Sequence, residues 1–276
     1  MTTAISSTAT AALLAALLPA RKGAAWQVGP APQIIRAGAA TARLVQGGRA
    51  LDVVELNGRI EVYADRRGPA LSPDVVVAAT GSDPVAELTA LVLRVVLPRL
   101  AREVARVTER DHGREQVVVE TTEEMNEVAG ALIAKGAHLE VVPRLDGVGM
   151  TWSTGDAEWG LWVLGGAGSP GNLSLTYEGP VSGLYGLLPV VLPSGGWQDS
   201  DGLGSVFTRH LTDRFPQLRT LNADEVTFGR RDDAGVYVAL PSADESTDRT
   251  DDSRRVVAEV NGLGTDLLLT AVSHLV

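Results

Sequence analysis

The sequence contains no cysteine among its 276 residues. The chain therefore cannot form disulfides, use a thiolate as a nucleophile or bind a metal through cysteine sulfur. Because disulfides belong to oxidising compartments, we expect a protein of the reducing cytoplasm. Lysine is scarce too: Lys22 and Lys135 are the only two, and neither follows a glycine-rich loop of the kind that holds a nucleotide phosphate.

Long apolar runs are also missing. No stretch reaches the roughly 20 apolar residues that a membrane-spanning helix needs, and Arg94 interrupts the best candidate. The apolar segment near the N-terminus has no basic residue before it, the reverse of the order in a signal peptide. We expect an ordinary helix there, carrying Leu13, Leu14, Leu17 and Leu18 and ended by Pro19. The sequence thus predicts no contact with a membrane.

Charge is unevenly distributed along the chain. Aromatic residues are few, at 4%, whereas 45% apolar and 21% charged residues are ordinary values for a globular protein. The net charge is −10; residues 1–118 hold 14 basic and 11 acidic residues, and residues 119–276 hold 10 and 23. The acidic second part would repel a phosphate backbone, so only the first part of the chain could contact nucleic acid.

The order of elements predicts an α+β protein of about three repeated units, each a helix, an antiparallel meander of three or four strands and a second helix. In the first unit, residues 50–56, 60–65 and 74–80 have strand patterns, and Asn57 with Gly58 forms a turn signal. Asp83 can cap a helix that Pro84 begins. We predict helices over residues 84–97, 123–135, 203–215 and 265–275.

The predicted units span residues 1–112, 118–196 and 197–276. Two segments have the composition of linkers, the charged 108–116 and the glycine-rich 193–204, and the acidic segment 241–252 is predicted to be an exposed loop. A meander has one apolar face, and a helix laid over it completes the core. The repetition therefore indicates a scaffold rather than an active site.

Motifs for catalysis or cofactors are weak. Residues 166–171, GAGSPG, match the spacing of a dinucleotide-binding loop, but a strand pattern follows where that motif needs a helix, which favours a hairpin loop. His210 and Asp213 lie one helical turn apart, with Asp199 and Asp201 upstream, an arrangement that favours a solvated helix surface over an acid–base or metal cluster. We predict no catalytic residue, no metal site and no cofactor, and an enzyme is the less favoured interpretation.

An arginine stripe follows Pro98: Arg99, Arg102, Arg106 and Arg110 recur at intervals of three and four residues. Like charges at this spacing cost about 0.2–0.5 kcal/mol per pair on a helix, so the stripe either meets an anionic partner or is tolerated as a solvated face. Glu103 and Glu109 beside it favour tolerance. An anionic partner would be a nucleic acid or an acidic protein surface, including the acidic part of this chain.

Trp152 and Trp159 flank the turn signal at Gly155 and Asp156. A two-residue turn would place the two tryptophans directly opposite each other on neighbouring strands, a pair worth about 0.5–1.5 kcal/mol beyond burial. Packing is the favoured role. The alternative is an aromatic platform for a base, a sugar or a partner side chain, so both residues count as candidate partner-binding residues.

The sequence therefore favours a non-enzymatic binding or assembly protein that acts through protein–protein contacts or self-association. The first alternative is a nucleic-acid-associated protein of a phage or mobile element, which rests on the arginine stripe. The second is a hydrolase with a site near His210. The order of helix, strands and helix in acidic units without cysteine resembles small acidic secretion chaperones in architecture, which implies a binding role.

Overall fold

The computed structural model describes residues 7–29, 39–64, 72–144, 147–163, 173–193, 204–229, 235–240 and 252–276. Helices accompany two antiparallel sheets, which confirms the predicted α+β class. The chain divides into two compact units, residues 1–100 and 101–276. The predicted loop at 166–171 lies outside the described residues, as do all but the ends of segments 193–204 and 241–252.

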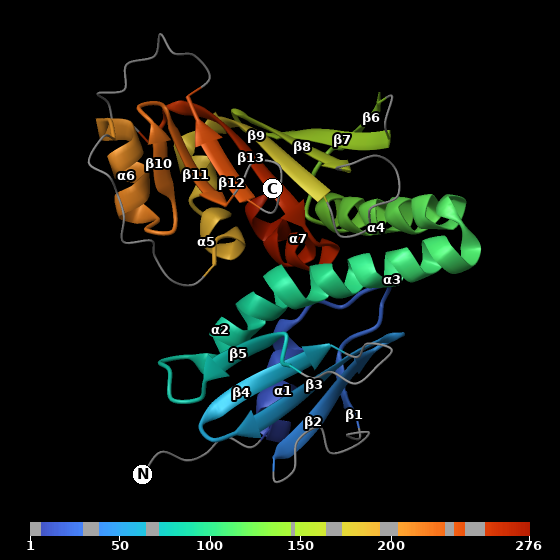
Figure 1. Cartoon of the computed structure of the whole chain (residues 1–276). Helices are drawn as coiled ribbons and strands as arrows, with labels where there is room; N and C mark the ends of the chain where they lie inside the picture. Colours follow the sequence, from blue (N-terminus) through green and yellow to red (C-terminus); the bar gives the residue numbers. More distant parts are fainter. Residues whose placement is uncertain are drawn as a thin grey trace. The chain divides into compact units, whose positions relative to one another are not determined.

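The first unit is a five-stranded meander with helices before and after it (Figure 1). The strands pair in chain order, each antiparallel to the next. Its elements are α1 (Ser7–Leu17), β1 (Gln27–Gly29), β2 (Ala40–Gln46), β3 (Arg49–Leu56), β4 (Arg59–Ala64), β5 (Val75–Ala78) and α2 (Pro84–Leu91). The predicted turn is present, because Asn57 and Gly58 both have positive φ angles, 52° and 72°, between β3 and β4.

The start of α2 agrees with the sequence. The Ala86 N–H donates to the Asp83 carboxylate at 3.0 Å, and Pro84 occupies the first turn. The predicted helix 84–97 does not end there, however. A π turn, η1 (Val92–Val96), leads directly into α3 (Leu97–His112). Pro98 has no N–H to give to a helical carbonyl, and the wider turn before it accommodates the ring without a break.

The predicted linker at 108–116 is wrong, because this segment is helical on both sides of Gly113. Gly113 has a φ of 85°, which lets the chain turn from α3 into α4 (Arg114–Ala134). The boundary between the compact units lies inside α3, after Leu100, rather than near residue 112. A sequence rich in charge can be a solvated helix as readily as a loop, and composition alone does not separate the two.

Helix α4 begins at Arg114, well before the predicted start at residue 123. Thr121 and Thr122 look like N-caps in the sequence. In the structure their hydroxyls donate to the carbonyls of Val117 and Val118, each at 2.9 Å, four residues earlier in the same helix. This bonding is the other option open to a threonine, and it places both residues in the interior of α4.

The second unit contains one eight-stranded antiparallel sheet in the order β10-β11-β12-β13-β9-β8-β7-β6. Its strands are β6 (Glu140–Arg144), β7 (Gly147–Thr154), β8 (Ala157–Val163), β9 (Leu173–Pro180), β10 (Arg219–Asn222), β11 (Glu225–Gly229), β12 (Gly235–Ala239) and β13 (Arg255–Leu263). The helices after α4 are η2 (Val181–Leu184), α5 (Leu188–Val191), α6 (Val206–Arg214), α7 (Thr265–Ala271) and η3 (Val272–His274). Helices α6 and α7 with η3 lie within the predicted ranges.

The predicted division into units at 118–196 and 197–276 does not separate two compact bodies. Strand β9 is the last strand of the first of these segments and β13 the last strand of the second, and the two pair along almost their whole length. Hydrogen bonds between them join the two meanders into one sheet. The order helix, strands, helix occurs in each segment, but a repeat beyond this order of elements remains a prediction.

The eight-stranded sheet has a covered face and an open face. Helices α4, α5 and α7 lie on one side of it (Figure 1), and the residues that point to this covered face are mostly apolar and buried. Successive residues of a strand point to opposite faces. The intervening residues of the same strands therefore form the open face. None of the helices within the described ranges combines the length and apolarity needed to cross a membrane.

Candidate binding face

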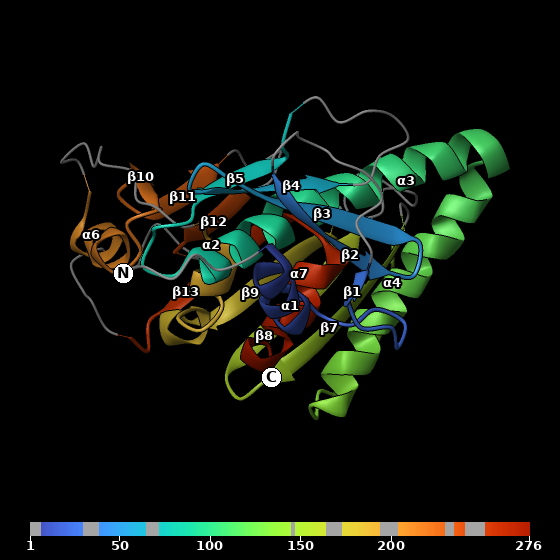
Figure 2. The same ribbon diagram turned by 90° about the horizontal axis from the view of Figure 1, so that it is seen from below.

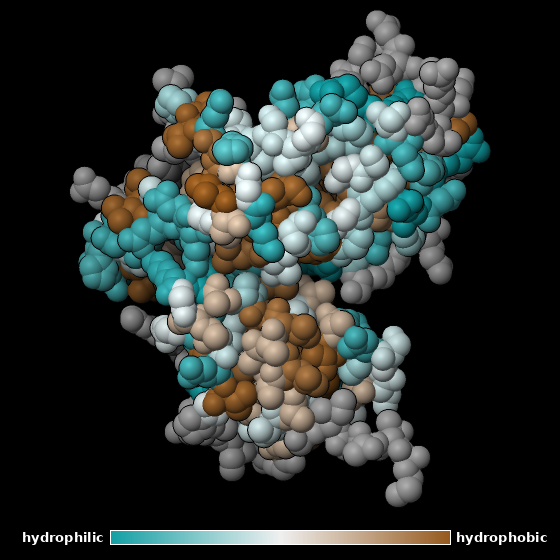
Figure 3. Space-filling model, turned by 180° about the vertical axis from the view of Figure 1, so that it is seen from behind, coloured by the Kyte–Doolittle hydropathy of each residue, from teal (hydrophilic) through white to brown (hydrophobic). Residues whose placement is uncertain are grey.

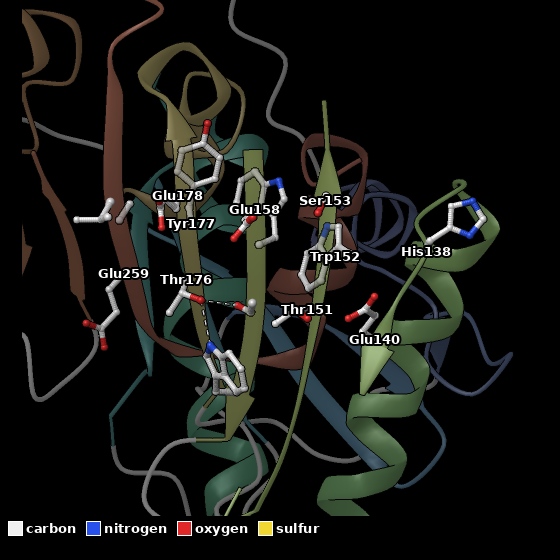
Figure 4. A pocket seen from close by; sticks show the side chains of 15 residues that line it. His138, Glu140, Thr151, Trp152, Ser153, Glu158, Thr176, Tyr177, Glu178 and Glu259 are labelled. Carbon is white, nitrogen blue, oxygen red and sulfur yellow. Dashed lines mark hydrogen bonds between the residues drawn. The ribbon is translucent and has the colours of Figure 1, made fainter. Parts of the chain in front are cut away.

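A groove of about 820 Å³ lies on the open face, across strands β6, β7, β8, β9 and β13 (Figure 4). The open-face side chains that line it are Glu140, Thr151, Ser153, Glu158, Trp162, Thr176, Glu178, Val257 and Glu259. Ser153, Glu158 and Glu178 are exposed, whereas Thr151 and Thr176 are partly buried. We call it the acidic groove.

A tryptophan forms the floor at one end of the acidic groove. The Trp162 indole lies over Gly149 and Gly160 of the same sheet, and its Nε1 donates to the Thr176 hydroxyl at 3.0 Å. A Cβ on Gly149 would overlap the ring, and one on Gly160 would come within 2.8 Å of Nε1. The two glycines are thus required for the ring to lie flat on the strands.

Sequence reasoning missed Trp162. Its signal was present, because Gly149 and Gly160 are the neighbours of Trp162 and Thr151 in the register of β7 and β8. Glycine inside a strand often marks a close approach of another group. The pattern becomes readable only when the register is known, since the sequence places these glycines eleven residues apart.

Four carboxylates give the groove its charge: Glu140, Glu158, Glu178 and Glu259. Glu158 and Glu178 are directly opposite each other on β8 and β9, an arrangement that destabilises a sheet. The Arg255 guanidinium offsets part of this repulsion by bonding Glu178 Oε1 at 3.1 Å. The Asn261 amide donates to Glu259 Oε1 at 3.0 Å. Within the described residues, Glu140 and Glu158 have no ion pair.

The structure confirms that Trp152 and Trp159 are directly opposite, on β7 and β8. They point to the covered face, are each 3% exposed, and stack with their ring centres 6.3 Å apart. Trp152 Nε1 donates to the Leu275 carbonyl at 2.8 Å, and Trp159 Nε1 donates to the Thr154 hydroxyl at 2.9 Å. These contacts give both rings a packing role, so the alternative of an aromatic platform for a ligand does not fit their burial.

All four residues of the arginine stripe lie on α3, but their surroundings differ. Arg99 belongs to the first unit, where its Nη1 is 3.6 Å from Asp74 Oδ1. The same Asp74 carboxylate accepts from the Ala64 N–H at 2.9 Å, so Asp74 contacts both Arg99 and the end of β4. Arg102 is partly buried, whereas Arg106 and Arg110 are exposed. The stripe thus reaches solvent at its C-terminal end.

His210 does not form a cluster with Asp213. The His210 Nε2 is 3.0 Å from the Tyr185 hydroxyl, which donates to Asp252 Oδ1 at 2.6 Å, and the Arg214 guanidinium lies 3.8 Å from the centre of the Tyr185 ring. Burial, followed by the hydrogen bond to Asp252, raises the pKa of Tyr185 well above its usual value. A tyrosine that holds its proton so firmly is a poor nucleophile. Asp199 and Asp201 lie outside the described residues.

Metal ligands do not gather in the part of the chain that the structure describes: no group of three or more histidine or carboxylate side chains there could hold an ion. The prediction of no metal site is made for the whole chain and stays a prediction.

The first unit exposes an apolar surface of its own. Leu13 and Leu17 of α1 are 49% and 52% exposed, and Ala9, Ala12 and Ala16 are exposed beside them. Figure 3 shows apolar side chains gathered on this side of the first unit. The predicted helix is therefore present, with Leu14 and Leu18 buried and the other two leucines facing solvent.

Comparison with known proteins gives no relative. No family model matches the chain, no curated protein is similar to it, and no solved structure shares its fold at a significant level.

Proposed function

We propose that the protein is a non-enzymatic binding or assembly protein of the cytoplasm, and that its open face binds another polypeptide. The observation that carries the proposal is the acidic groove. An eight-stranded sheet normally buries both faces or presents a polar, solvated one. Here the open face is hollowed, has an indole in its floor and holds two exposed carboxylates, Glu140 and Glu158, that form no ion pair with a described residue.

The size and lining of the acidic groove suit the side chains of a bound polypeptide better than a small molecule. A cavity of about 820 Å³ is within the range of small-molecule sites, but those are concave and mostly apolar with few polar groups. The acidic groove is instead lined mainly by threonine, serine and glutamate side chains, spread over five strands. Such a surface offers many weak contacts over a wide area, as a protein interface does.

Neither alternative function is supported by a specific contact. Nucleic acid would have to bind through the arginine stripe, of which Arg99 already pairs with Asp74. Hydrolysis near His210 would need a nucleophile, and the group bonded to His210 is the Tyr185 hydroxyl, whose pKa is raised. The binding function therefore stands as the proposal by itself.

The test is site-specific photo-crosslinking in the native host. A photo-reactive amino acid replaces Ser153, which is exposed on the open face, or Asn126, which is exposed on α4 and serves as the control. We expect a discrete crosslinked product from position 153 and none of the same mass from 126, and the product should disappear when Glu158→Arg is added. Equal crosslinking from both positions, or none from position 153, would contradict the proposal.

A further inference from the structure

The occupant of the acidic groove can be argued from charge. Glu140 and Glu158 both point to the open face, Glu140 from the edge strand β6 and Glu158 from β8. Both side chains are exposed, and neither forms an ion pair with any residue in the described ranges. Glu158 also lies directly opposite Glu178 on β9. Like charges directly opposite each other destabilise a sheet, and a cationic partner would offset that repulsion.

The second unit also carries a matching cationic surface. Arg106 and Arg110 are exposed on α3, close to the corner at Gly113 where α3 meets α4. In both ribbon views this corner lies at the margin of the second unit (Figures 1 and 2). Viewed down the helix axis, successive residues are about 100° apart, so Glu103 and Glu109 lie on opposite sides of the stripe and the arginines lie between them.

The charged residues of the α3 surface and those of the acidic groove are separated by similar distances. Arg102 and Arg110 are eight residues apart, which separates their Cα atoms by about 12 Å along a helix. Glu140 and Glu158 are two strands apart and offset by two residues along the strand, which also separates their Cα atoms by about 12 Å. Arg106 falls between the other two arginines and would face Thr151 and Ser153 in the middle of the groove.

We propose that the acidic groove of one copy of this chain binds the α3 surface of a second copy, through Arg102, Arg106 and Arg110. The inference rests on the proposed function and names the partner of the same face. The two surfaces are different parts of the chain, so the contact is heterologous and joins copies head to tail unless the rotation closes a ring or a reciprocal pair.

The association is expected to be weak. One helix face on an open groove buries less than the roughly 1,200 Å² at which stable interfaces begin, which places it among transient contacts. Both copies have a net charge of −10, and their general repulsion is screened beyond about 8 Å at physiological salt while the local pairs remain. We therefore expect dissociation constants of about micromolar or weaker.

The experiment is analytical ultracentrifugation of the full-length chain over a wide concentration range. Wild type should associate reversibly, and Arg106→Glu/Arg110→Glu and Glu140→Arg/Glu158→Arg should each weaken association about tenfold or more, because like charges then face each other. A 1:1 mixture of the two variants should recover association, since one retains an intact groove and the other an intact stripe. The chain with all four substitutions should also recover it.

Each charge-reversed variant has a control variant with the same change in net charge. Glu87→Arg/Asp213→Arg raises the net charge as the groove variant does, and both residues are exposed and absent from the groove lining. Arg59→Glu/Lys135→Glu lowers it as the stripe variant does. Each control should associate like wild type. If a reversed variant does not fold by circular dichroism, the Gln versions at the same four positions replace it, with a smaller loss expected.

Three results would overturn the inference: a wild type that stays monomeric at the highest soluble concentration, reversed variants that associate like their controls, or a mixture that stays dissociated. A crosslink from Ser153 to a different polypeptide, with monomeric wild type, would remove the self-association and leave the proposed function standing. The absence of both crosslink and association would remove the two together.

Discussion

The covered and open faces of the eight-stranded sheet are built from alternate residues of the same strands, yet they have opposite chemistry. On β8 and β9, Trp159 and Tyr177 point to the covered face, with their ring centres 4.4 Å apart and each 3% exposed. Their neighbours Glu158 and Glu178 are exposed on the open face. Stability thus depends mainly on one face, which leaves residues of the other free to serve binding.

The largest expected effect comes from breaking the covered face. Trp159→Ala removes a buried ring and its stacking with Trp152 and Tyr177, so the free energy of unfolding should fall by about 3–5 kcal/mol. Glu158→Gln, on the next residue but the open face, should change it by no more than about 0.5 kcal/mol. Urea denaturation of both variants measures the contrast. Similar losses would show that the two faces contribute equally to stability.

Unlike the rest of the open face, the floor of the acidic groove is expected to contribute to the stability of the fold. Gly149→Val would place methyl groups where the Trp162 ring lies, and the overpacking should cost about 1–3 kcal/mol of unfolding free energy. Combining it with Trp162→Ala should cost less than the sum of the two single changes, because the clash is gone. A double-mutant cycle in urea tests this coupling. Additive losses would mean that the ring does not rest on Gly149.

High pH should act on the covered face through Tyr177. Burial raises the pKa of this phenol to about 12, partly opposed by the charge of Arg255, and its hydroxyl donates to the Pro180 carbonyl. The folded state therefore keeps the proton longer than the unfolded state, whose pKa is about 10. The stability this provides is complete below pH 10 and is lost as the pH rises toward 12.

Tyr177→Phe cannot ionise, so it should lose less unfolding free energy than wild type between about pH 10 and pH 12. Urea denaturation at several pH values in that interval measures the difference. Tyr185, whose pKa is also raised, remains in both proteins and cancels from the comparison. Parallel pH profiles for the two proteins would rule out the effect.

The smallest effect concerns the open face alone. Glu158→Lys replaces a carboxylate directly opposite Glu178 with a cation, and should raise the free energy of unfolding by about 0.2–1 kcal/mol. The same change should weaken binding in the acidic groove, so that stability and binding move in opposite directions. Asp213→Lys, an exposed change on α6 outside the acidic groove, is the control for binding. A destabilised Glu158→Lys variant would show that Glu158 is a structural residue.

Local features of the fold could be read from the sequence because they depend on neighbouring residues. The Asp83 cap, the turn at Asn57 and Gly58, and the opposition of Trp152 and Trp159 across a two-residue turn all follow from side-chain chemistry within a few positions. The α+β class and most helices followed for the same reason. Thr121 and Thr122 can either cap a helix or bond to a carbonyl four residues earlier within it, and the local sequence does not separate the two options that the structure distinguishes.

What joins distant segments was decided only by the tertiary structure. The pairing of β9 with β13 merges two predicted units. The local sequence of either strand does not identify the strand with which it pairs. The same pairing carries Glu178 and Glu259 into one groove, while the register of β7 and β8 puts Gly149 beneath Trp162. Alternation in the sequence determined that each strand would have an apolar and a polar side. Which polar side chains would meet on the open face depended on strand order and register, which are set by hydrogen bonding between segments far apart in the chain.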